Sequence, residues 1–264
     1  MRITVIGGTG MIGTRLVRML RDSGHEVNAA SRATGVNSFT GEGLVAALEG
    51  ADVIVDVSNS SYTDDAAAQE FFFTSTMNLL SYGADAGVGH HVALSVVGTD
   101  RLARAQGGYF VAKQQQERLI TASGRPYTLV HATQFFEFIR SITDHALRSG
   151  AMRVADVLVQ PMAADDVARA VAQAALGEPR AGMVEWGGPE VFSLSDIAAM
   201  DLRARQDDRE VVADPLGTYF GARLARRDLL PEATATLAKT RYHDWRVQNP
   251  DGAVTYADAE RSSL

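Results

Sequence analysis

"RITVIGGTGMIG" (residues 2–13) is the stretch that decides the fold of this chain. Its first part, residues 2–7, is a short apolar run rich in β-branched residues, which predicts a buried strand. Gly7, Gly10 and Gly13 then follow in the pattern GxxGxxG. From residue 11 the apolar positions recur at helical spacing, and Gly24 is the expected stop of that helix. A glycine pattern between a strand and a helix predicts a loop that binds a dinucleotide.

Each glycine of the loop has a physical reason to be there. Gly7 permits a tight turn, Gly10 lets the backbone approach a pyrophosphate, and Gly13 lets the helix pack close to the strand. The N-terminus of the helix offers unpaired N–H groups and the positive end of its dipole to phosphates. Thr9, Met11 and Ile12 complete the expected binding loop. The alternative is a glycine-rich turn without a ligand.

The remainder of the chain alternates between strands and helices. We expect strands at 25–31, 51–58, 90–98 and 127–132, short strands near 152–160, and helices at 41–50, 64–86, 109–124, about 134–149 and 164–176. This alternation with short connections predicts an α/β fold of the Rossmann type, with a doubly wound parallel sheet. We place the dinucleotide-binding domain at 1–176. Residues 177–250 are expected to form a small, mostly helical substrate-pocket or lid region of the same compact unit, and 251–264 a polar tail.

Composition excludes several classes of function. The chain has 264 residues, of which 46% are hydrophobic, and it has no cysteine, so disulfides, thiolate metal sites and a catalytic cysteine are excluded. A net charge of −7 argues against nucleic-acid binding. We see no secretory signal and no apolar run long enough for a membrane. We therefore expect a cytoplasmic monomer or homodimer with a small-molecule substrate and neither membrane nor nucleic-acid partners.

No metal site is expected, because no His/Asp/Glu cluster has zinc-like spacing. His90 and His91 begin the strand expected at 90–98 and are interpreted as loop residues at its start rather than metal ligands. His131 is interpreted as a structural histidine rather than a catalytic base. Asp165 and Asp166 precede an apolar helical pattern, and we expect them to cap the N-terminus of that helix.

The end of the second strand indicates which dinucleotide binds. NAD sites usually place a carboxylate there, for the ribose 2′-hydroxyl. Here the stretch reads "NAASRATG" (28–35), so Ser31 and Arg32 occupy the position and no acid is present. A guanidinium suits a 2′-phosphate, which predicts NADP; the alternative is that Arg32 is a solvated loop residue. Val57 and Ser58, after the third strand, are expected to contact the cofactor through their backbone, and Thr133, after the fifth, to hold the nicotinamide amide.

Together with "ALSVVG" (93–98) and "GYFVAK" (108–113), these motifs make the chain resemble the short-chain dehydrogenase/reductase superfamily. More narrowly, residues 1–200 resemble its atypical, NmrA-like NAD(P)H-binding members. The resemblance implies that Tyr109 is the general acid/base and that Lys113, one helical turn away, tunes it and binds the nicotinamide ribose. A neighbouring ammonium lowers the pKa of a phenol, which is otherwise near 10 and too high for proton transfer at neutral pH. Ser95, at the end of the fourth strand, is expected to donate to a developing oxyanion.

Alternatives remain for these residues. Tyr109 can be an amphipathic residue at a helix start, and Lys113 a surface lysine. The resemblance implies an asparagine where this chain has Phe72, whereas Asn78 matches a structural asparagine of the same segment. In "QFFEF" (134–138), Phe135 and Phe136, with Phe138, are expected to wall the substrate pocket, and core packing is the alternative.

The function predicted from these features is an NADPH-dependent oxidoreductase. It would reduce the carbonyl group or quinone of a small, rather apolar molecule by hydride transfer, with Tyr109 as the general acid. One alternative is a non-catalytic NADP(H)-binding redox sensor or regulator of the NmrA type, which the replaced asparagine favours. Another is an NAD(P)-dependent epimerase or dehydratase.

Overall fold

The structure is a computed structural model that describes residues 1–60, 62, 64–105, 108–148 and 153–249. In this part of the chain seven strands form one parallel sheet: β1 (Arg2–Ile6), β2 (Glu26–Ala30), β3 (Val53–Asp56), β4 (His90–Val96), β5 (Tyr127–Ala132), β8 (Gly182–Gly187) and β11 (Thr236–Leu237). They lie in the order β11-β8-β5-β4-β3-β1-β2. The order reverses beside β1, and such a switch point opens a crevice at the carboxyl ends of the strands. The predicted doubly wound Rossmann-type fold is confirmed.

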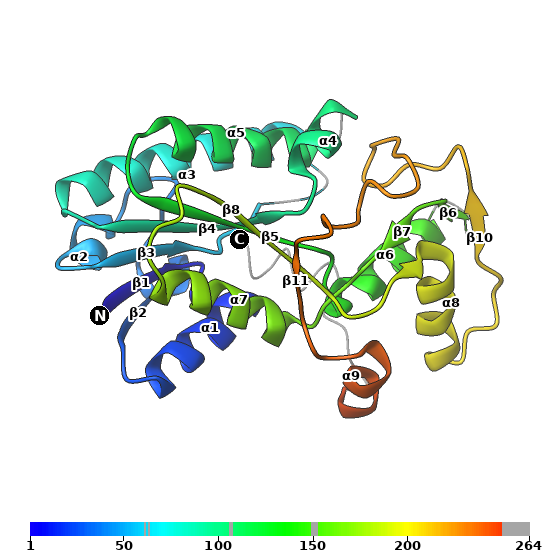
Figure 1. The fold of residues 1–264 in the computed structure, drawn as a ribbon. Helices are drawn as coiled ribbons and strands as arrows, with labels where there is room; N and C mark the ends of the chain where they lie inside the picture. Colours follow the sequence, from blue (N-terminus) through cyan, green and yellow to red (C-terminus); the bar gives the residue numbers. More distant parts are fainter. Residues whose placement is uncertain (61, 63, 106–107, 149–152, 250–264) are drawn as a thin grey trace.

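Helices cover both faces of the sheet (Figure 1). One face carries α1 (Met11–Asp22) and α7 (Ala164–Leu176). The other carries α3 (Asp65–Asp85) and α5 (Gly108–Ala122), with the short helices α2 (Leu44–Leu48) and α4 (Thr99–Arg104) beside them. A turn of 3₁₀ helix, Arg32–Thr34, follows β2. The predicted helices therefore exist, and the largest difference is that 41–50 shortens to α2.

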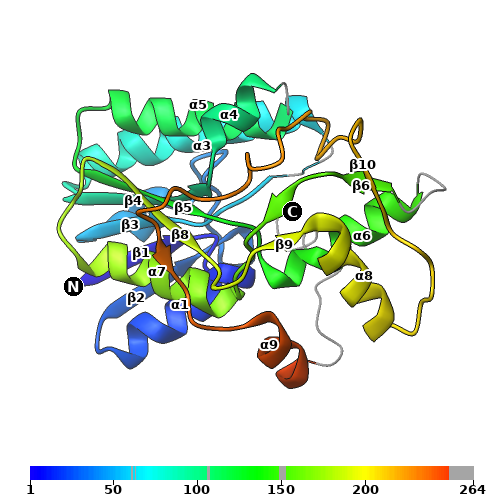
Figure 2. The same ribbon diagram turned by 45° about the vertical axis from the view of Figure 1, so that its right-hand side comes forward.

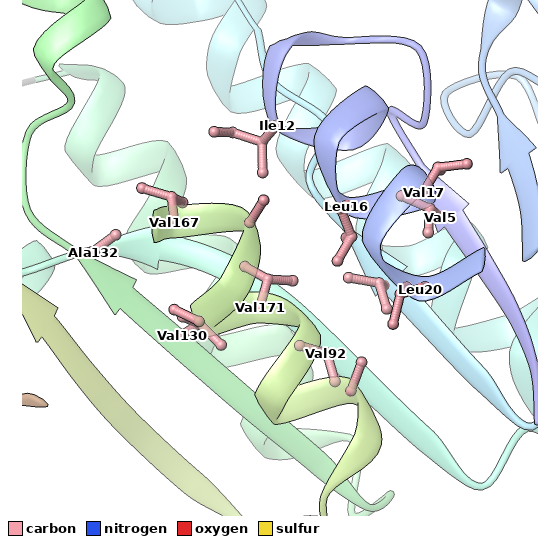
Figure 3. Packing of buried hydrophobic residues seen from close by; sticks show 14 of the residues in the cluster. Val5, Ile12, Leu16, Val17, Leu20, Val92, Val130, Ala132, Val167 and Val171 are labelled. Atoms are coloured by element: carbon pink, nitrogen blue, oxygen red, sulfur yellow. The ribbon is translucent and has the colours of Figure 1, made fainter. Parts of the chain in front are cut away.

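The packing of α1 fixes the position of the glycine loop. Leu16 and Leu20 of α1 are fully buried, as is Val171 of α7. Figure 3 shows these side chains meeting over Val92 and Val130 of the sheet. Burying each such side chain contributes roughly 1.5–3 kcal/mol, so α1 is held firmly against the sheet. Its N-terminus is thereby kept at the carboxyl end of β1.

The C-terminal elements gather beyond the carboxyl ends of the strands (Figure 2). They are α6 (Phe136–Arg148), α8 (Leu194–Ala204), α9 (Tyr242–Gln248), the parallel pair β6 (Arg153–Ala155) and β10 (Val212–Asp214), and the antiparallel pair β7 (Leu158–Val159) and β9 (Phe192–Ser193). After residue 176 the helices α8 and α9 contain more residues than the strands, as expected, but β8 and β11, which were not expected, extend the main sheet. The boundary between 1–176 and 177–250 stays a prediction, and the tail 251–264 lies outside the described residues.

His90 and His91 are the first residues of β4, where the strand expected at 90–98 begins, and burial lowers the pKa of His91 to about 4. One smaller expectation needs correction. The N-cap of α7 is Ala163, and no side chain caps it. Asp165 instead lies 3.5 Å from Arg15 Nε, and Asp166 accepts a hydrogen bond from the Thr240 N–H at 3.2 Å. Both carboxylates still lie in the first turn, where the helix dipole favours them.

No helix within the described ranges is long and apolar enough to cross a membrane.

Candidate active site

A cleft of about 450 Å³ opens at the switch point of the sheet. Most of the predicted site residues line it, although they come from five separate parts of the sequence: Gly7, Thr9, Gly10, Met11 and Ile12 from the glycine loop, Ser31 and Arg32, Val57 and Ser58, Ser95 from β4, and Tyr109 and Lys113 from α5. The fold therefore brings the expected cofactor-binding and catalytic residues to a single cavity.

The glycine loop leaves no room for side chains. Gly7 has a φ of +79°, which an L side chain rarely adopts. A Cβ added at Gly13 would lie 2.1 Å from the Gly7 carbonyl oxygen, and one at Gly8 would lie 2.7 Å from the Ala29 Cα. Gly13 therefore serves the close contact between helix and loop, as expected, and does not itself line the cleft. The need for Gly8 was missed, because β2 approaches it from outside the motif.

Cations and no acids line this cleft. Among the described residues of its wall, Arg15, Arg32 and Lys113 carry positive charge, and none is Asp or Glu. Arg15 was missed by sequence reasoning, although its place one turn into α1 points it at the loop; its Nη1 donates to the Met11 carbonyl oxygen at 2.8 Å. A glycine cradle with a positive lining fits the phosphates of a dinucleotide.

Tyr109 lies at the inner end of the cleft and is 5% exposed. Its hydroxyl donates to Asn59 Oδ1 at 2.7 Å, and Asn59 Nδ2 donates to the Tyr62 hydroxyl at 2.7 Å. The rings of Tyr62 and Tyr109 are tilted against each other with centroids 4.4 Å apart. Sequence reasoning assigned no role to Asn59 or Tyr62. The hydrogen bond between Asn59 and Tyr109 spans 50 residues and leaves no local signal.

Lys113 is buried, at 3% exposure, so it is not a surface lysine. Its Nζ donates to the Leu94 carbonyl oxygen at 2.8 Å and to the side-chain oxygen of Gln116. Gln116 in turn donates to Asp56 Oδ2 at 2.9 Å. Burial lowers the pKa of Lys113 to about 8, although the negative charges of Asp56 and Glu117 oppose this. The group is thus held near the border between its two protonation states at mildly alkaline pH.

Phe72 fills the position where the resemblance implies an asparagine. It is fully buried, and the Lys113 ammonium lies 4.6 Å from the centre of its ring, within cation–π distance. Asn78 donates to the backbone oxygens of Ser38 and Phe39 at 2.9 and 3.0 Å, which confirms its structural role.

Ser95 lines the cleft but points its proton elsewhere. Its hydroxyl donates to Glu117 Oε1, and His131 Nε2 lies 3.1 Å from the same oxygen. Burial raises the pKa of Glu117, but the hydrogen bonds from His131 and Ser95 and the charge of His131 outweigh it, so the net pKa is lowered. Glu117 was missed, although it lies one helical turn beyond Lys113.

A second cavity of about 90 Å³ adjoins the first. Ser95, Val96, Tyr109, Tyr62, Phe135 and Phe138 line both cavities, and the smaller one is completed mainly by Phe110, Ala132, Thr133, Ile142, Tyr219 and Phe220. Its wall is aromatic and contains no Asp, Glu, Lys or Arg among the described residues.

Two predicted residues lie elsewhere than expected. Thr133 lines this second cavity, not the cleft, and its hydroxyl donates to the Gln160 carbonyl oxygen at 2.7 Å. Phe136 does not wall either cavity; it packs against Tyr242 and Trp245 at ring distances of 5.1 and 5.4 Å. The prediction for Phe136 is corrected, because α6 turns it toward the core while its neighbour Phe135 faces the site. Within the described part of the chain, no three His, Asp or Glu residues are grouped as for a metal ion.

Comparison with known proteins supports the binding of NAD(P)H. The model of an NAD(P)H-binding family matches residues 7–178, more than half of the chain. The photosystem II assembly factor Ycf39 of Synechocystis sp. is 25% identical over 151 residues, which cover 52% of this chain and 46% of that protein. Ycf39 of Cyanophora paradoxa is 26% identical over the same shares. The matched part thus spans less than half of these relatives.

Several solved structures share the fold. MoeE5 in complex with UDP-glucuronic acid and NAD has a TM-score of 0.71 at 18% identity and matches over 100% of both chains. The Bordetella bronchiseptica enzyme WbmH in complex with NAD⁺ has a TM-score of 0.69 at 14% identity, over 100% of this chain and 99% of that one. The UDP-glucose 4-epimerase of Thermus thermophilus, in complex with NAD, has a TM-score of 0.63 at 17% identity over 100% of both. At these identities the likeness establishes the fold.

Proposed function

The chain belongs to this NAD(P)H-binding family, among the atypical short-chain dehydrogenase/reductases that its sequence resembles, and from that premise we propose that it is an NADPH-dependent oxidoreductase. The proposed reaction reduces the carbonyl group or quinone of a small, rather apolar molecule. One observation carries the proposal: a single cleft joins the glycine loop, two arginines and the Tyr109–Lys113 pair to an aromatic cavity.

The positive lining supports NADP as the cofactor. Thr9 to Gly13 would hold the diphosphate, and Ser31 and Arg32 the 2′-phosphate, with Arg15 adding charge from α1. The absence of a carboxylate among the described residues of the wall supports NADP over NAD, because a carboxylate would repel the extra phosphate. Bound there, the reduced nicotinamide supplies the hydride.

Tyr109 would supply the proton. Its hydroxyl would turn from Asn59 to the substrate oxygen and protonate it there. The Lys113 ammonium favours the phenolate that results, because an adjacent positive charge stabilises it. Ser95, which lines both cavities, would orient the hydroxyl group formed by this proton transfer.

The second cavity supports an apolar substrate. Phe135, Phe138 and Phe220 offer ring faces, and the described wall contains no Asp, Glu, Lys or Arg side chain. Several neighbours of the same fold were solved with UDP-sugars or named as acting on them. A cavity without cations is poorly suited to the diphosphate of a nucleotide sugar, so the reductase is favoured over an epimerase.

The test is NADPH consumption with a panel of aromatic aldehydes, ketones and quinones. Tyr109→Phe should lower kcat by about 10²–10⁴-fold while leaving the Kd for NADPH within about twofold, because only the proton donor is lost. Tyr82→Phe, remote from both cavities, is the matched control and should change neither. Turnover that survives in Tyr109→Phe would contradict the assigned role of the phenol.

A specific observation supports the alternative of a redox sensor. Lys113 is engaged by Leu94 and Gln116, and Phe72 replaces the expected asparagine. A sensor would bind NADPH and NADP⁺ with different affinities and turn over no member of the panel. Turnover with similar affinities for both forms would exclude it.

A further inference from the structure

A buried acid–base cluster behind Ser95 has no part in the function proposed above. Glu117 of α5 lies between Ser95 of β4 and His131 of β5. Ser95 and His131 are 4% and 5% exposed, and the Glu117 side chain 16%. Hydrogen bonds from a hydroxyl to a carboxylate are about twice as strong as neutral ones, so this contact fixes the direction of the Ser95 hydroxyl.

The protons of the cluster can be assigned one by one. A serine hydroxyl has one proton and two lone pairs, whereas an ionised carboxylate only accepts. Glu117 is ionised near neutral pH, because the groups around it lower its pKa in spite of burial. Thr99, 3.3 Å from Ser95, gives its own proton to the Val96 carbonyl oxygen. The Ser95 proton is therefore committed to Glu117, and its lone pairs remain for a ligand.

The hydroxyl of Tyr109, like that of Ser95, donates its proton to a protein group. Its hydroxyl proton is accepted by Asn59 Oδ1. Ser95 and Tyr109, two of the hydroxyls that line both cavities, thus direct their protons into the protein and not toward a ligand. A carbonyl compound offers only lone pairs, and at Ser95 it would meet lone pairs. An alcohol or a hydroquinone offers a proton and complements them.

We propose that Glu117 is a positioning residue that holds the proton of Ser95 away from the cavity, so that the site selects a ligand hydroxyl over the corresponding carbonyl. The inference rests on the proposed function, because the oxygen concerned is the one that Tyr109 protonates. In reduction, the carbonyl carbon gains a hydride from the reduced nicotinamide and the oxygen gains the Tyr109 proton. The resulting hydroxyl group donates a hydrogen bond to Ser95 Oγ. An alcohol that binds for the reverse reaction would donate the same hydrogen bond.

The first experiment measures binding of a matched pair, 1-phenylethanol and acetophenone, to the cofactor-free protein, where neither probe can react. Wild type should bind the alcohol on the order of tenfold more tightly than the ketone. This ratio corresponds to the free energy of one hydrogen bond that the alcohol makes and the ketone does not. Ser95→Ala should abolish this preference. Glu117→Gln should reduce it, because an amide also donates and releases the Ser95 proton. In the Ser95→Ala background, Glu117→Gln should then change the ratio no further.

Equal or tighter binding of acetophenone by wild type would overturn the inference. So would a Glu117→Gln effect on the ratio that persists without Ser95, because Glu117 would then act by another route. If neither probe binds, the ligand-selecting half of the proposal is refuted.

A second measurement tests the contact without any ligand. The carboxyl ¹³C resonance of Glu117, followed with pH, should show a proton affinity about tenfold higher in Ser95→Ala, since the hydrogen bond to the ionised form is lost. Thr121→Ala is the matched control on the same helix, because the Thr121 hydroxyl bonds only the Glu117 backbone oxygen, at 2.8 Å. If the titration of Glu117 is the same in Ser95→Ala as in wild type, the role of Glu117 is refuted even if the protein turns over NADPH. If the protein does not turn over NADPH, the reductase is refuted, but the titration still tests the contact between Glu117 and Ser95.

Discussion

Raising the pH from 8 toward 9.5 should stabilise the cofactor-free protein through a single buried side chain, Lys113. Burial lowers the pKa of its ammonium from 10.5 to about 8, against the opposing charges of Asp56 and Glu117. A difference of this size corresponds to about 3 kcal/mol of free energy at neutral pH. That amount is the destabilisation from holding the charge away from water, and it is fully present below pH 8.

The sign follows from proton binding. Between pH 8 and 10.5 the unfolded chain keeps the lysine protonated while the folded chain does not. The unfolded state then binds more protons, so the free energy of unfolding rises with pH. Integrated from pH 8 to about 9.5, the contribution of Lys113 is about 1.5 kcal/mol. The range stops there because tyrosines of the unfolded chain begin to ionise near pH 10.

Urea unfolding at the two pH values would measure this contribution. The free energy of unfolding of wild type minus that of Lys113→Met should increase by about 1.5 kcal/mol from pH 8 to about 9.5, because all other groups are shared. Lys239→Met, at the exposed second lysine, should follow wild type at both values.

A direct titration is also available, because the chain contains only these two lysines. With ¹³C-labelled lysine, the resonance that disappears in Lys113→Met should titrate near pH 8. A Lys113 resonance that titrates at the ordinary value for lysine, or parallel pH dependences of wild type and Lys113→Met, would refute the buried ammonium. In the reductase, the proton-transfer step should then slow above about pH 8, as the charge that stabilises the Tyr109 phenolate disappears.

Three further predictions test the cleft. Arg32→Ala should weaken NADP binding about tenfold or more in calorimetry, as expected for one lost contact to phosphate, and leave NAD within about twofold; equal losses would contradict the choice of NADP. Gly13→Ala would place a Cβ 2.1 Å from the Gly7 oxygen and should abolish binding of both dinucleotides and lower Tm, whereas Gly182→Ala, with its nearest neighbour at 3.7 Å, should do neither. Phe136→Ala should cost about 3–5 kcal/mol of stability as a core truncation, while Phe135→Ala should mainly raise KM; the reverse order would show that the core and cavity positions of these two residues are misassigned.

The sequence predicted well those parts of the fold that are determined by residues close together in the chain. The strand, glycine turn and helix of residues 2–24 are adjacent in the chain, so spacing alone reveals them. The pairing of Tyr109 with Lys113 is likewise a matter of one helical turn. β8 was not predicted, because this six-residue strand begins and ends with glycine and is flanked by prolines, a composition that indicates a loop. Only its pairing with β5 makes these residues a strand.

The hydrogen-bond partners of the candidate catalytic groups could not be predicted from residues close to them in the chain. Asn59 reaches Tyr109 across 50 residues, and Glu117 meets Ser95 only because α5 packs beside β4. Neither contact produces a periodic pattern, since each depends on how separate elements come together. The sequence therefore indicated which side chains reach the cleft but not which way their protons point.

The replacement of an asparagine by Phe72 bears directly on the choice between enzyme and sensor. In the structure the ammonium of Lys113 keeps its support without an asparagine: a ring face lies 4.6 Å away, and Gln116 links it to the Asp56 carboxylate. A charge supported by protein groups stays in place when water is excluded, as hydride transfer requires. The loss of the asparagine therefore removes one route for replacing the Tyr109 proton, but it does not remove the charge that makes Tyr109 an acid. A sensor would have no need of that charge, because binding a dinucleotide requires the glycine loop and the arginines, not an ammonium buried beside a phenol. Retention of such a destabilising group at this place favours proton chemistry over simple binding.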